Sequence, residues 1–191
     1  MLATAGDPDG GELEPGLLER CQAGERAALR AFVEHYQGAV FALLSRIIGQ
    51  HPEVEDLAQE TFLRAIRALP GFDMEGPARL STWLLTIATR LALDVCRKRR
   101  RELRPSLAEP VSVATPEHEA QRAQLRGAIA AAVDDLPDDQ RAAFVLAEFH
   151  GFAIDDIAGA LQAPANTVKT RLFRARAKLS RALAQHRGHS E

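Results

Sequence analysis

Apolar residues recur along this chain three to four positions apart, in several separate stretches, as they do on one face of a helix. The first stretch begins near Glu14 and is interrupted at Gly24, and a second helix is expected over about 38–49, ending at Gly49. Pro52 opens a third helix, "PEVEDLAQETFLRAIRAL", with acids in its first turn, where the helix dipole favours them. Its predicted apolar stripe consists of Val54, Leu57, Ala58, Thr61, Phe62, Ala65 and Ile66.

A loop rich in proline and glycine, "PGFDMEGPARLS", precedes a fourth helix, "STWLLTIATRLALDVCRKRRR", with Ser81 or Thr82 as its N-cap. Residues 105–120 have three prolines, no Lys or Arg and no clear period, so we predict a flexible linker there. Helical patterns then return in "QRAQLRGAIAAAVDDL", "PDDQRAAFVLAEFHG", "AIDDIAGAL" and "NTVKTRLFRARAKLSRALAQ", the last with Asn166 as N-cap.

No stretch alternates between apolar and polar residues for long enough to predict a sheet. The sequence therefore predicts an all-α fold of two small helical domains joined by a flexible linker. The expected division is a disordered leader at 1–13, a first domain at 14–104, the linker at 105–120, a second domain at 121–187 and a tail at 188–191.

Composition narrows the class of protein. With 191 residues, 46% hydrophobic and 26% charged, the chain is typical of a globular protein. It has no apolar window long enough for a transmembrane helix and no secretory signal at its N-terminus, so we expect no membrane insertion. Cys21 and Cys96 are far apart and have no metal-type spacing, which favours buried thiols in a reducing cytoplasm; no metal or cofactor is expected.

Charge is distributed unevenly around a formal net charge of −2. Residues 97–104, "RKRRRELR", hold six basic groups and one acid, and residues 167–187 hold seven basic groups and no acid. The segments "HPEVEDLAQE" and "DDLPDDQ" are acidic. Two separate basic stretches on a near-neutral chain predict two contacts with one polyanion, and the alternative is two solvated helix faces.

A short helix, a turn of about four residues and a basic helix form a helix-turn-helix pattern over "AIDDIAGAL", "QAPA" and "NTVKTRLFRARAKL". The residues expected to face inward are Ile154, Ile157, Ala158, Leu161, Val168, Leu172, Ala175 and Leu179, and those expected to face outward include Lys169, Thr170, Phe173, Arg174 and Ala177. An arginine near the start of such a helix can bind guanine, whereas Arg171, Arg176, Lys178 and Arg181 are better placed for phosphates. A surface helix that only keeps the domain soluble is the alternative.

Two segments resemble a known family. "LPDDQRAAFVLAEFHGFAIDDIAGALQAPANTVKTRLFRARAKL" resembles region 4 of the sigma-70 family, which reads the −35 promoter element, and "EDLAQETFLRAIRALPGFDMEGPARLSTWLLTIATRLALDVCRKRRR" resembles region 2. Their order, the short length and the bare linker are similar to the extracytoplasmic-function (group IV) class of bacterial sigma factor, over about residues 14–185.

The resemblance implies a non-catalytic specificity subunit of RNA polymerase, in the cytoplasm, that directs transcription initiation at a dedicated set of promoters. The implied partners are core RNA polymerase (the β′ clamp helices and the β flap), promoter DNA and an anti-sigma factor.

The resemblance also implies which residues bind. Those matching the family's core-polymerase motif are Asp56, Gln59, Glu60 and Arg64. Those expected at the −10 element are Phe72, Thr82, Trp83, Thr89, Arg90, Asp94, Arg97, Lys98, Arg99, Arg100 and Arg101, with Trp83 favoured as support rather than as a stacking residue. Those expected at the −35 element are Asn166, Thr167, Lys169, Thr170, Arg171, Phe173, Arg174, Arg176 and Lys178. Arg90 departs from the family, in which asparagine is common at this position.

Two other classes of function fit the sequence less well. An enzyme is disfavoured because the chain has no glycine-rich phosphate loop, no G-x-S-x-G motif and no zinc-type Cys/His spacing. A stand-alone activator or repressor with a LuxR-like helix-turn-helix explains residues 150–180 equally well. It does not explain the second basic helix or the acidic and amide-bearing face at 55–64, which could otherwise be an acid cluster that stabilises its own helix.

Overall fold

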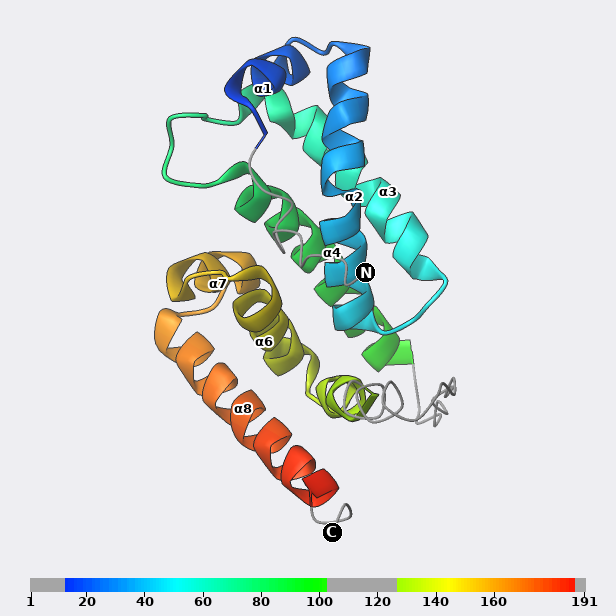
Figure 1. Ribbon diagram of the computed structural model, residues 1–191, viewed down its shortest axis with the longest axis vertical. Coiled ribbons are helices and arrows are strands. Elements are labelled where there is room, and N and C mark those ends of the chain that lie inside the picture. Colours follow the sequence, from blue (N-terminus) through cyan, green and yellow to red (C-terminus); the bar gives the residue numbers. More distant parts are fainter. Residues whose placement is uncertain (1–12, 103–126, 188–191) are drawn as a thin grey trace.

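The computed structural model describes residues 13–102 and 127–187 (Figure 1). Over these residues the chain is helical with connecting turns and contains no strand, so the predicted all-α class is confirmed. The helices form two lobes, which we call the first lobe (residues 13–102) and the second lobe (residues 127–187). The predicted linker at 105–120 and tail at 188–191, and the leader apart from Leu13, lie outside the described residues.

The first lobe contains α1 (Pro15–Gln22), α2 (Arg26–Ile48), α3 (Glu53–Ala68), the short 3-10 helix η1 (Leu69–Gly71) and α4 (Leu80–Glu102). Helices α2, α3 and α4 pack against one another, and α1 packs against α2. Phe32 lies edge-on to Tyr36 and Phe62, with ring centroids 5.4 and 6.0 Å away. Every residue of the predicted apolar stripe of α3 is buried except Ile66, which packs partly buried against the core.

One predicted helix boundary in the first lobe is wrong. The pattern predicted a break before a second helix at about 38–49, but α2 runs unbroken from Arg26 to Ile48 through Gly38. Val40 and Leu44 continue the buried face that Phe32 and Tyr36 begin, and burial of this shared face outweighs the roughly 1 kcal/mol that glycine costs within a helix. The interruption at Gly24 and the end at Gly49 are confirmed, and both glycines have positive φ (79° and 81°).

The second lobe contains a helical segment at 127–134, then α6 (Asp138–His150), α7 (Ile154–Leu161) and α8 (Ala165–Arg187). Helices α6, α7 and α8 pack against one another. The four predicted inward residues of α8 are buried (Val168, Leu172, Ala175 and Leu179). On α7, Ile157 and Leu161 are buried, and Ile154 and Ala158 are partly buried against the same core.

Two predicted N-caps are wrong, each by a small shift. Helix α4 begins at Leu80, so Ser81 and Thr82 lie inside its first turn, and Ser81 is buried. Helix α8 begins at Ala165, and Pro164 precedes it, with its carbonyl accepting from the amide of Thr167 at 2.8 Å. Asn166 is therefore the second residue of the helix. Proline suits this entry because its fixed φ is close to the helical value and it brings no N–H that needs a partner.

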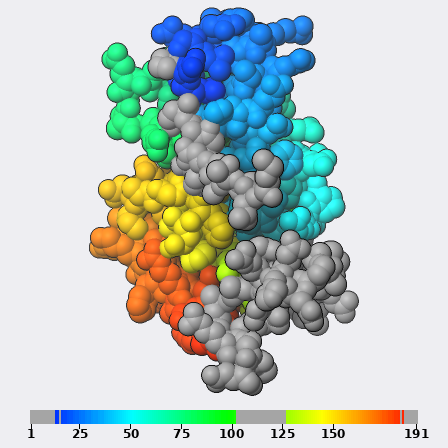
Figure 2. All heavy atoms as spheres, viewed as in Figure 1, coloured from blue at the N-terminus to red at the C-terminus, as the bar shows by residue number. Residues whose placement is uncertain are grey.

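The two lobes touch. Helix α4 packs against α7 and α6, and α2 packs against α6, so the helix-turn-helix of the second lobe lies against the first lobe (Figures 1 and 2). Within the described ranges, no helix combines the length and the apolar character needed to cross a bilayer.

Candidate nucleic-acid interface

The outward face of α8 carries side chains suited to DNA near the start of the helix. Lys169, Thr170 and Arg174 are exposed, and Phe173 has 73% of its surface accessible. Asn166 and Thr167 are also exposed in the first turn. Among the described residues, no acidic side chain forms an ion pair with Lys169 or Arg174. These cations are thus available to an anion, and the aromatic ring between them offers an apolar contact for a thymine methyl group.

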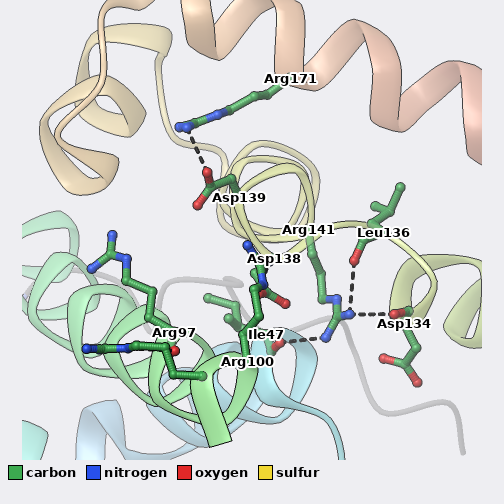
Figure 3. A network of polar contacts seen from close by, with 10 residues as sticks. Ile47, Arg97, Arg100, Asp134, Leu136, Asp138, Asp139, Arg141 and Arg171 are labelled. Atoms are coloured by element: carbon green, nitrogen blue, oxygen red, sulfur yellow. Dashed lines mark hydrogen bonds and ion pairs between the residues drawn. The ribbon is translucent and has the colours of Figure 1, made fainter. Parts of the chain in front are cut away.

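Three other basic side chains of α8 turn back toward their own lobe. Arg171 contacts Asp139 at 2.8 Å (Figure 3), Arg176 contacts Glu148 at 2.7 Å, and Lys178 lies 3.8 Å from Asp135. The acids belong to α6 and to the turn before it. These three residues, predicted as phosphate contacts, therefore join α8 to α6 and to the turn before it in this arrangement. Because exposed ion pairs contribute only up to about 1 kcal/mol, a DNA phosphate could still compete for them.

The loop before α4 is fixed at its start by α1 and by an aromatic pair. The side-chain amide of Gln22 donates to the carbonyls of Leu69 and Phe72, at 3.2 and 2.8 Å. The ring of Phe72 lies against Trp83, with centroids 5.2 Å apart, and both are half-buried. Each ring supports the other while keeping part of its surface exposed next to the loop.

The predicted −10 residues differ in how accessible they are. Thr82 is half-buried, while Thr89 is fully buried and its hydroxyl donates to the carbonyl of Leu85 at 2.8 Å. In the arrangement described here, Thr89 does not reach a ligand. Asp94 is exposed and pairs with Arg97 at 2.8 Å, one turn along the same helix.

The basic end of α4 is partly occupied by contacts within the protein. Arg99 contacts the carboxylate of Glu53 at the start of α3, and the distance between its Nε and Oε2 of Glu53 is 3.1 Å. Its Nη1 donates to the carbonyl of Ile48 at 3.2 Å. Arg101 donates to the carbonyl of Arg97 at 3.2 Å. Arg99 keeps the pKa of Glu53 below its ordinary value, mainly by hydrogen bonding to the ionised carboxylate. Lys98 is exposed, and no ion pair is seen for it within the described ranges.

Arg90 and Arg100 contact the second lobe. The Arg90 guanidinium donates from Nη2 to the carbonyl of Gly159 at 2.9 Å, and its Nε lies 3.5 Å from the carbonyl of Ala160. Arg100 pairs with Asp138 at 2.5 Å (Figure 3). Both arginines are predicted −10 residues on the first lobe, and their partners belong to α7 and α6.

The predicted polymerase-binding residues do share one exposed face of α3. Asp56, Gln59 and Arg64 are exposed and Glu60 is half-buried, and Glu60 pairs with Arg64 at 2.6 Å. Leu63 lies on the same face with 48% of its surface accessible. Leu63 was not predicted from the sequence, although its absence from the apolar stripe and its spacing of seven residues from Asp56 could have indicated it.

Sequence reasoning also missed Arg141. Its guanidinium reaches from α6 to the first lobe, where Nη1 donates to the carbonyl of Ile47 at 2.9 Å (Figure 3). Nη2 donates to the carbonyls of Asp134, at the end of the helical segment at 127–134, and of Leu136 just after it, the latter at 3.0 Å. No spacing rule indicates such contacts, because backbone carbonyls are present at every position.

The expected buried thiols are confirmed: Cys21 and Cys96 are free and buried, and burial raises the pKa of both. Within residues 13–102 and 127–187, no three His, Cys, Asp or Glu side chains gather as metal ligands would.

A helix-turn-helix in one lobe and a basic helix in the other define a two-module nucleic-acid-binding protein. Comparison with protein families agrees with this class: the model for "Sigma-70 region 2" matches residues 32–102, and that for "Sigma-70, region 4" matches residues 126–179.

Known proteins agree as well. The chain is 36% identical over 184 residues to the RNA polymerase sigma-H factor of Pseudomonas aeruginosa, covering 90% of this chain and 94% of that one. It is 32% identical over 175 residues to the ECF RNA polymerase sigma-E factor of Haemophilus influenzae, covering 85% and 91%.

Solved structures share the fold. CnrH, in complex with the cytosolic domain of CnrY, is 27% identical with a TM-score of 0.61, covering 94% of this chain and 99% of that chain. The sigma factor RpoE of Bartonella quintana, in complex with the anti-sigma factor NepR, is 26% identical with a TM-score of 0.62, covering 81% and 96%. The chain belongs to the sigma-70 family, as an extracytoplasmic-function sigma factor. It is thus a specificity subunit of RNA polymerase that directs initiation at promoters.

Proposed function

We propose that α3 of this sigma factor binds the β′ clamp helices of core RNA polymerase through Asp56, Gln59, Glu60 and Arg64. The proposal is supported by their shared exposed face and by the buried stripe on the opposite side, which fixes that face outward. Two acids and an amide suit a partner helix rich in arginine, and the exposed Leu63 beside them can bury apolar surface on contact.

The first lobe then reads the −10 element. Phe72 and Trp83 lie at the loop where an unstacked base would be received, with Trp83 as support, and Thr82, Thr89, Arg90 and Asp94 follow along α4. Arg97, Lys98, Arg99, Arg100 and Arg101 supply positive charge for the backbone phosphates. Thr89 and the two arginines bound to the second lobe become available only when the surrounding contacts change.

The second lobe reads the −35 element with α8. Lys169, Thr170, Phe173 and Arg174, with Asn166 and Thr167 in the first turn, are proposed to face the major groove. We propose that DNA phosphates are bound by the three basic residues that also contact α6 and the turn before it, namely Arg171, Arg176 and Lys178. The same lobe would contact the β flap of the polymerase.

The chain is further proposed to act in the cytoplasm, to carry no catalytic activity of its own, and to be held inactive by an anti-sigma factor. The last point rests on the similar sigma factor from Bartonella quintana, whose structure contains the anti-sigma factor NepR.

One observation carries the proposal: the chain has two helices suited to DNA, α4 and α8, in the order of sigma-70 regions 2 and 4. The alignment with the sigma-E factor of Haemophilus influenzae covers 91% of that relative, so both regions are included. The decisive test is run-off transcription with purified core polymerase on a genomic template pool, followed by mapping of transcript starts. Core enzyme plus this chain should initiate at discrete sites that core alone does not use. A stand-alone activator or repressor would instead bind its operator without polymerase and would fail to associate with core in the absence of DNA.

A further inference from the structure

The short helix α1 lies before the stretch that matches region 2, which begins at residue 32, so that match gives α1 no role. It packs against α2 and against η1, at the same end of the first lobe as the loop before α4 (Figure 1). Its last residue, Gln22, is half-buried and directs its side-chain amide at the carbonyls of Leu69 and Phe72. Helix α1 thus contacts this loop at the point where the loop begins.

One side-chain amide makes both of these contacts. Nε2 of Gln22 lies 3.2 Å from the carbonyl oxygen of Leu69 and 2.8 Å from that of Phe72. An amide nitrogen carries two N–H donors, so it can serve both carbonyls at once. The Leu69 carbonyl also accepts from the backbone amide of Phe72 at 3.0 Å. Gln22 and this turn together fix the backbone that leads into the loop.

Helix α1 is itself held in place, so it can act as an anchor. Leu18 and Cys21 are buried in the core of the first lobe. After the helix, Gly24 turns the chain with a positive φ of 79°. Arg20 and Glu25 join their side chains across this turn through two charge-assisted hydrogen bonds. Because α1 is tied to α2 in this way, its last residue has a defined position.

The groups that this anchor holds are the rings of Phe72 and Trp83. Their centroids are 5.2 Å apart, and both side chains keep part of their surface accessible. The carbonyl of Phe72 that Gln22 binds is separated from the Phe72 ring only by Cα and Cβ, so a displaced carbonyl also displaces the ring. If the rings were not already in place, ordering them would use part of the free energy of binding a base.

We propose that Gln22 is a positioning residue of the −10 site, which keeps the Phe72–Trp83 pair preorganised for an unstacked base by holding the start of the loop. This role deepens the proposed function and rests on it, because it assumes that the loop receives a base of the −10 element. Gln22 acts through Phe72 and not by binding DNA.

Two variants remove the donors of Gln22 and preserve the size of its side chain. Gln22→Met is apolar and of similar length, and Gln22→Glu places an ionised carboxylate, which donates no hydrogen bond, against two carbonyl oxygens. Gln37→Met is the matched control, because Gln37 is an exposed glutamine on α2. Circular dichroism melting verifies that each variant is folded.

The first readout is the fluorescence of Trp83, the only tryptophan of the chain, in the free protein. Loss of the anchor should shift its emission to longer wavelength and increase its quenching by acrylamide, because the indole loses the cover of Phe72. Both Gln22 variants should show these changes, and Gln37→Met should not. Unchanged emission and quenching in both Gln22 variants would overturn the proposal, whatever their activity in transcription.

The second readout is run-off transcription by core polymerase with the full chain, on a promoter chosen from mapped transcript starts. Gln22→Met should lower initiation about 5–30-fold while association with core is unchanged, because two hydrogen bonds that order the loop are lost. In a Phe72→Ala background the same change should lower initiation by less than about 2-fold, because Gln22 acts through Phe72. A merely structural role would lower initiation by the same factor in both backgrounds, and that result would overturn the proposal.

The two readouts distinguish failure of this inference from failure of the proposed function. If the wild type initiates and Gln22→Met initiates equally well, the positioning role is wrong and the proposed function stands. If the wild type neither associates with core polymerase nor initiates, the proposed function fails, and the fluorescence of Trp83 alone decides whether Gln22 anchors the two rings.

Discussion

At the scale of single residues, several arginines have structural partners that the sequence did not indicate. Arg99 was predicted only as a phosphate contact, yet it joins three helices, because it lies on α4, pairs with Glu53 at the start of α3 and donates to the carbonyl of Ile48 at the end of α2. Only 24% of its side chain is accessible. A charge-assisted contact that is partly buried contributes more than an exposed ion pair.

Arg99→Ala should therefore lower the free energy of unfolding by about 1–2 kcal/mol, more than an exposed ion pair contributes but at the low end for a hydrogen bond to a charged group, because Glu53 is partly exposed. The difference should be largest near neutral pH. Because the pKa of Glu53 in the folded protein is lowered from its ordinary value of 4.5, the contribution is lost as pH falls below that value. Thermal denaturation followed by circular dichroism between about pH 7 and pH 3 measures this.

Lys98→Ala is the control, since it removes an exposed neighbouring charge and should cost less than about 0.5 kcal/mol. Equal melting temperatures for Arg99→Ala and Lys98→Ala at neutral pH would show that Arg99 does not hold the helices together.

The two faces of α8 lead to a second prediction about single residues. Arg174 is exposed and, within the described residues, is without an ion pair, whereas Arg176 is bound to Glu148. Arg174→Ala should lose about 1–3 kcal/mol at a promoter with an intact −35 element and little at one with a scrambled element. Arg176→Ala should weaken both promoters alike. Run-off transcription from the paired templates separates a base contact from a phosphate contact, and a uniform loss with Arg174→Ala would assign it to phosphate.

At the scale of elements, the sequence predicted helix interiors better than helix ends. The stripes of α3 and α8 were predicted residue by residue, because a period of 3.6 determines which side of a helix is buried. The starts of α4 and α8 were misplaced, because serine and asparagine are only favoured N-caps and the chain enters α8 through Pro164 instead. Gly38 suggested a helix boundary because glycine has a low helix propensity, and the sequence does not show the core packing that outweighs this cost.

The candidate surfaces were likewise predictable only where they depend on a single helix. The exposed face of α3 followed from its stripe, so Asp56, Gln59 and Arg64 were placed correctly on it. The partners of Arg90, Arg100 and Arg141 could not be predicted, because they depend on how two separate lobes meet. Periodicity describes each helix alone and contains no information about this arrangement.

The face of α3 supplies a prediction for this element. The double variant Asp56→Ala/Glu60→Ala should bind core polymerase roughly 5–50-fold more weakly in a pull-down or by surface plasmon resonance, because it removes both acids facing the partner. Its unfolding should change little, since Asp56 is exposed and the Glu60–Arg64 pair is an exposed i,i+4 contact. Glu19→Ala/Glu34→Ala removes two exposed acids from α1 and α2 and serves as the control. Undiminished core affinity in the α3 variant would rule out this face as the polymerase contact.

At the scale of the whole molecule, the proposed promoter contacts call for a second arrangement of the lobes beside the one described here. In the structure α7 packs against α4, whereas simultaneous contact of the two lobes with the proposed −10 and −35 elements would need them apart by more than the diameter of the compact chain. Elements centred roughly 25 base pairs apart are separated by about 85 Å of duplex, at about 3.4 Å per base pair. We expect the predicted linker at 105–120 to set how far they can separate. Fully extended, 16 residues reach about 55 Å, so the two lobes plus this span match the separation of the promoter elements with little excess.

Shortening that segment should therefore prevent the two lobes from contacting both promoter elements at the same time. Deleting residues 109–116 removes about 28 Å of reach, which is too much for the second lobe to stay on the −35 element while the first remains on the −10 element. Run-off transcription from a two-element promoter should fall to the level of a template lacking the −35 element, while association with core polymerase through α3 is retained. Replacing the same eight residues with glycine and serine keeps the length and should keep initiation. If the shortened chain initiates as well as the glycine–serine variant, reach does not limit promoter recognition, and the lobes engage DNA without separating along the linker.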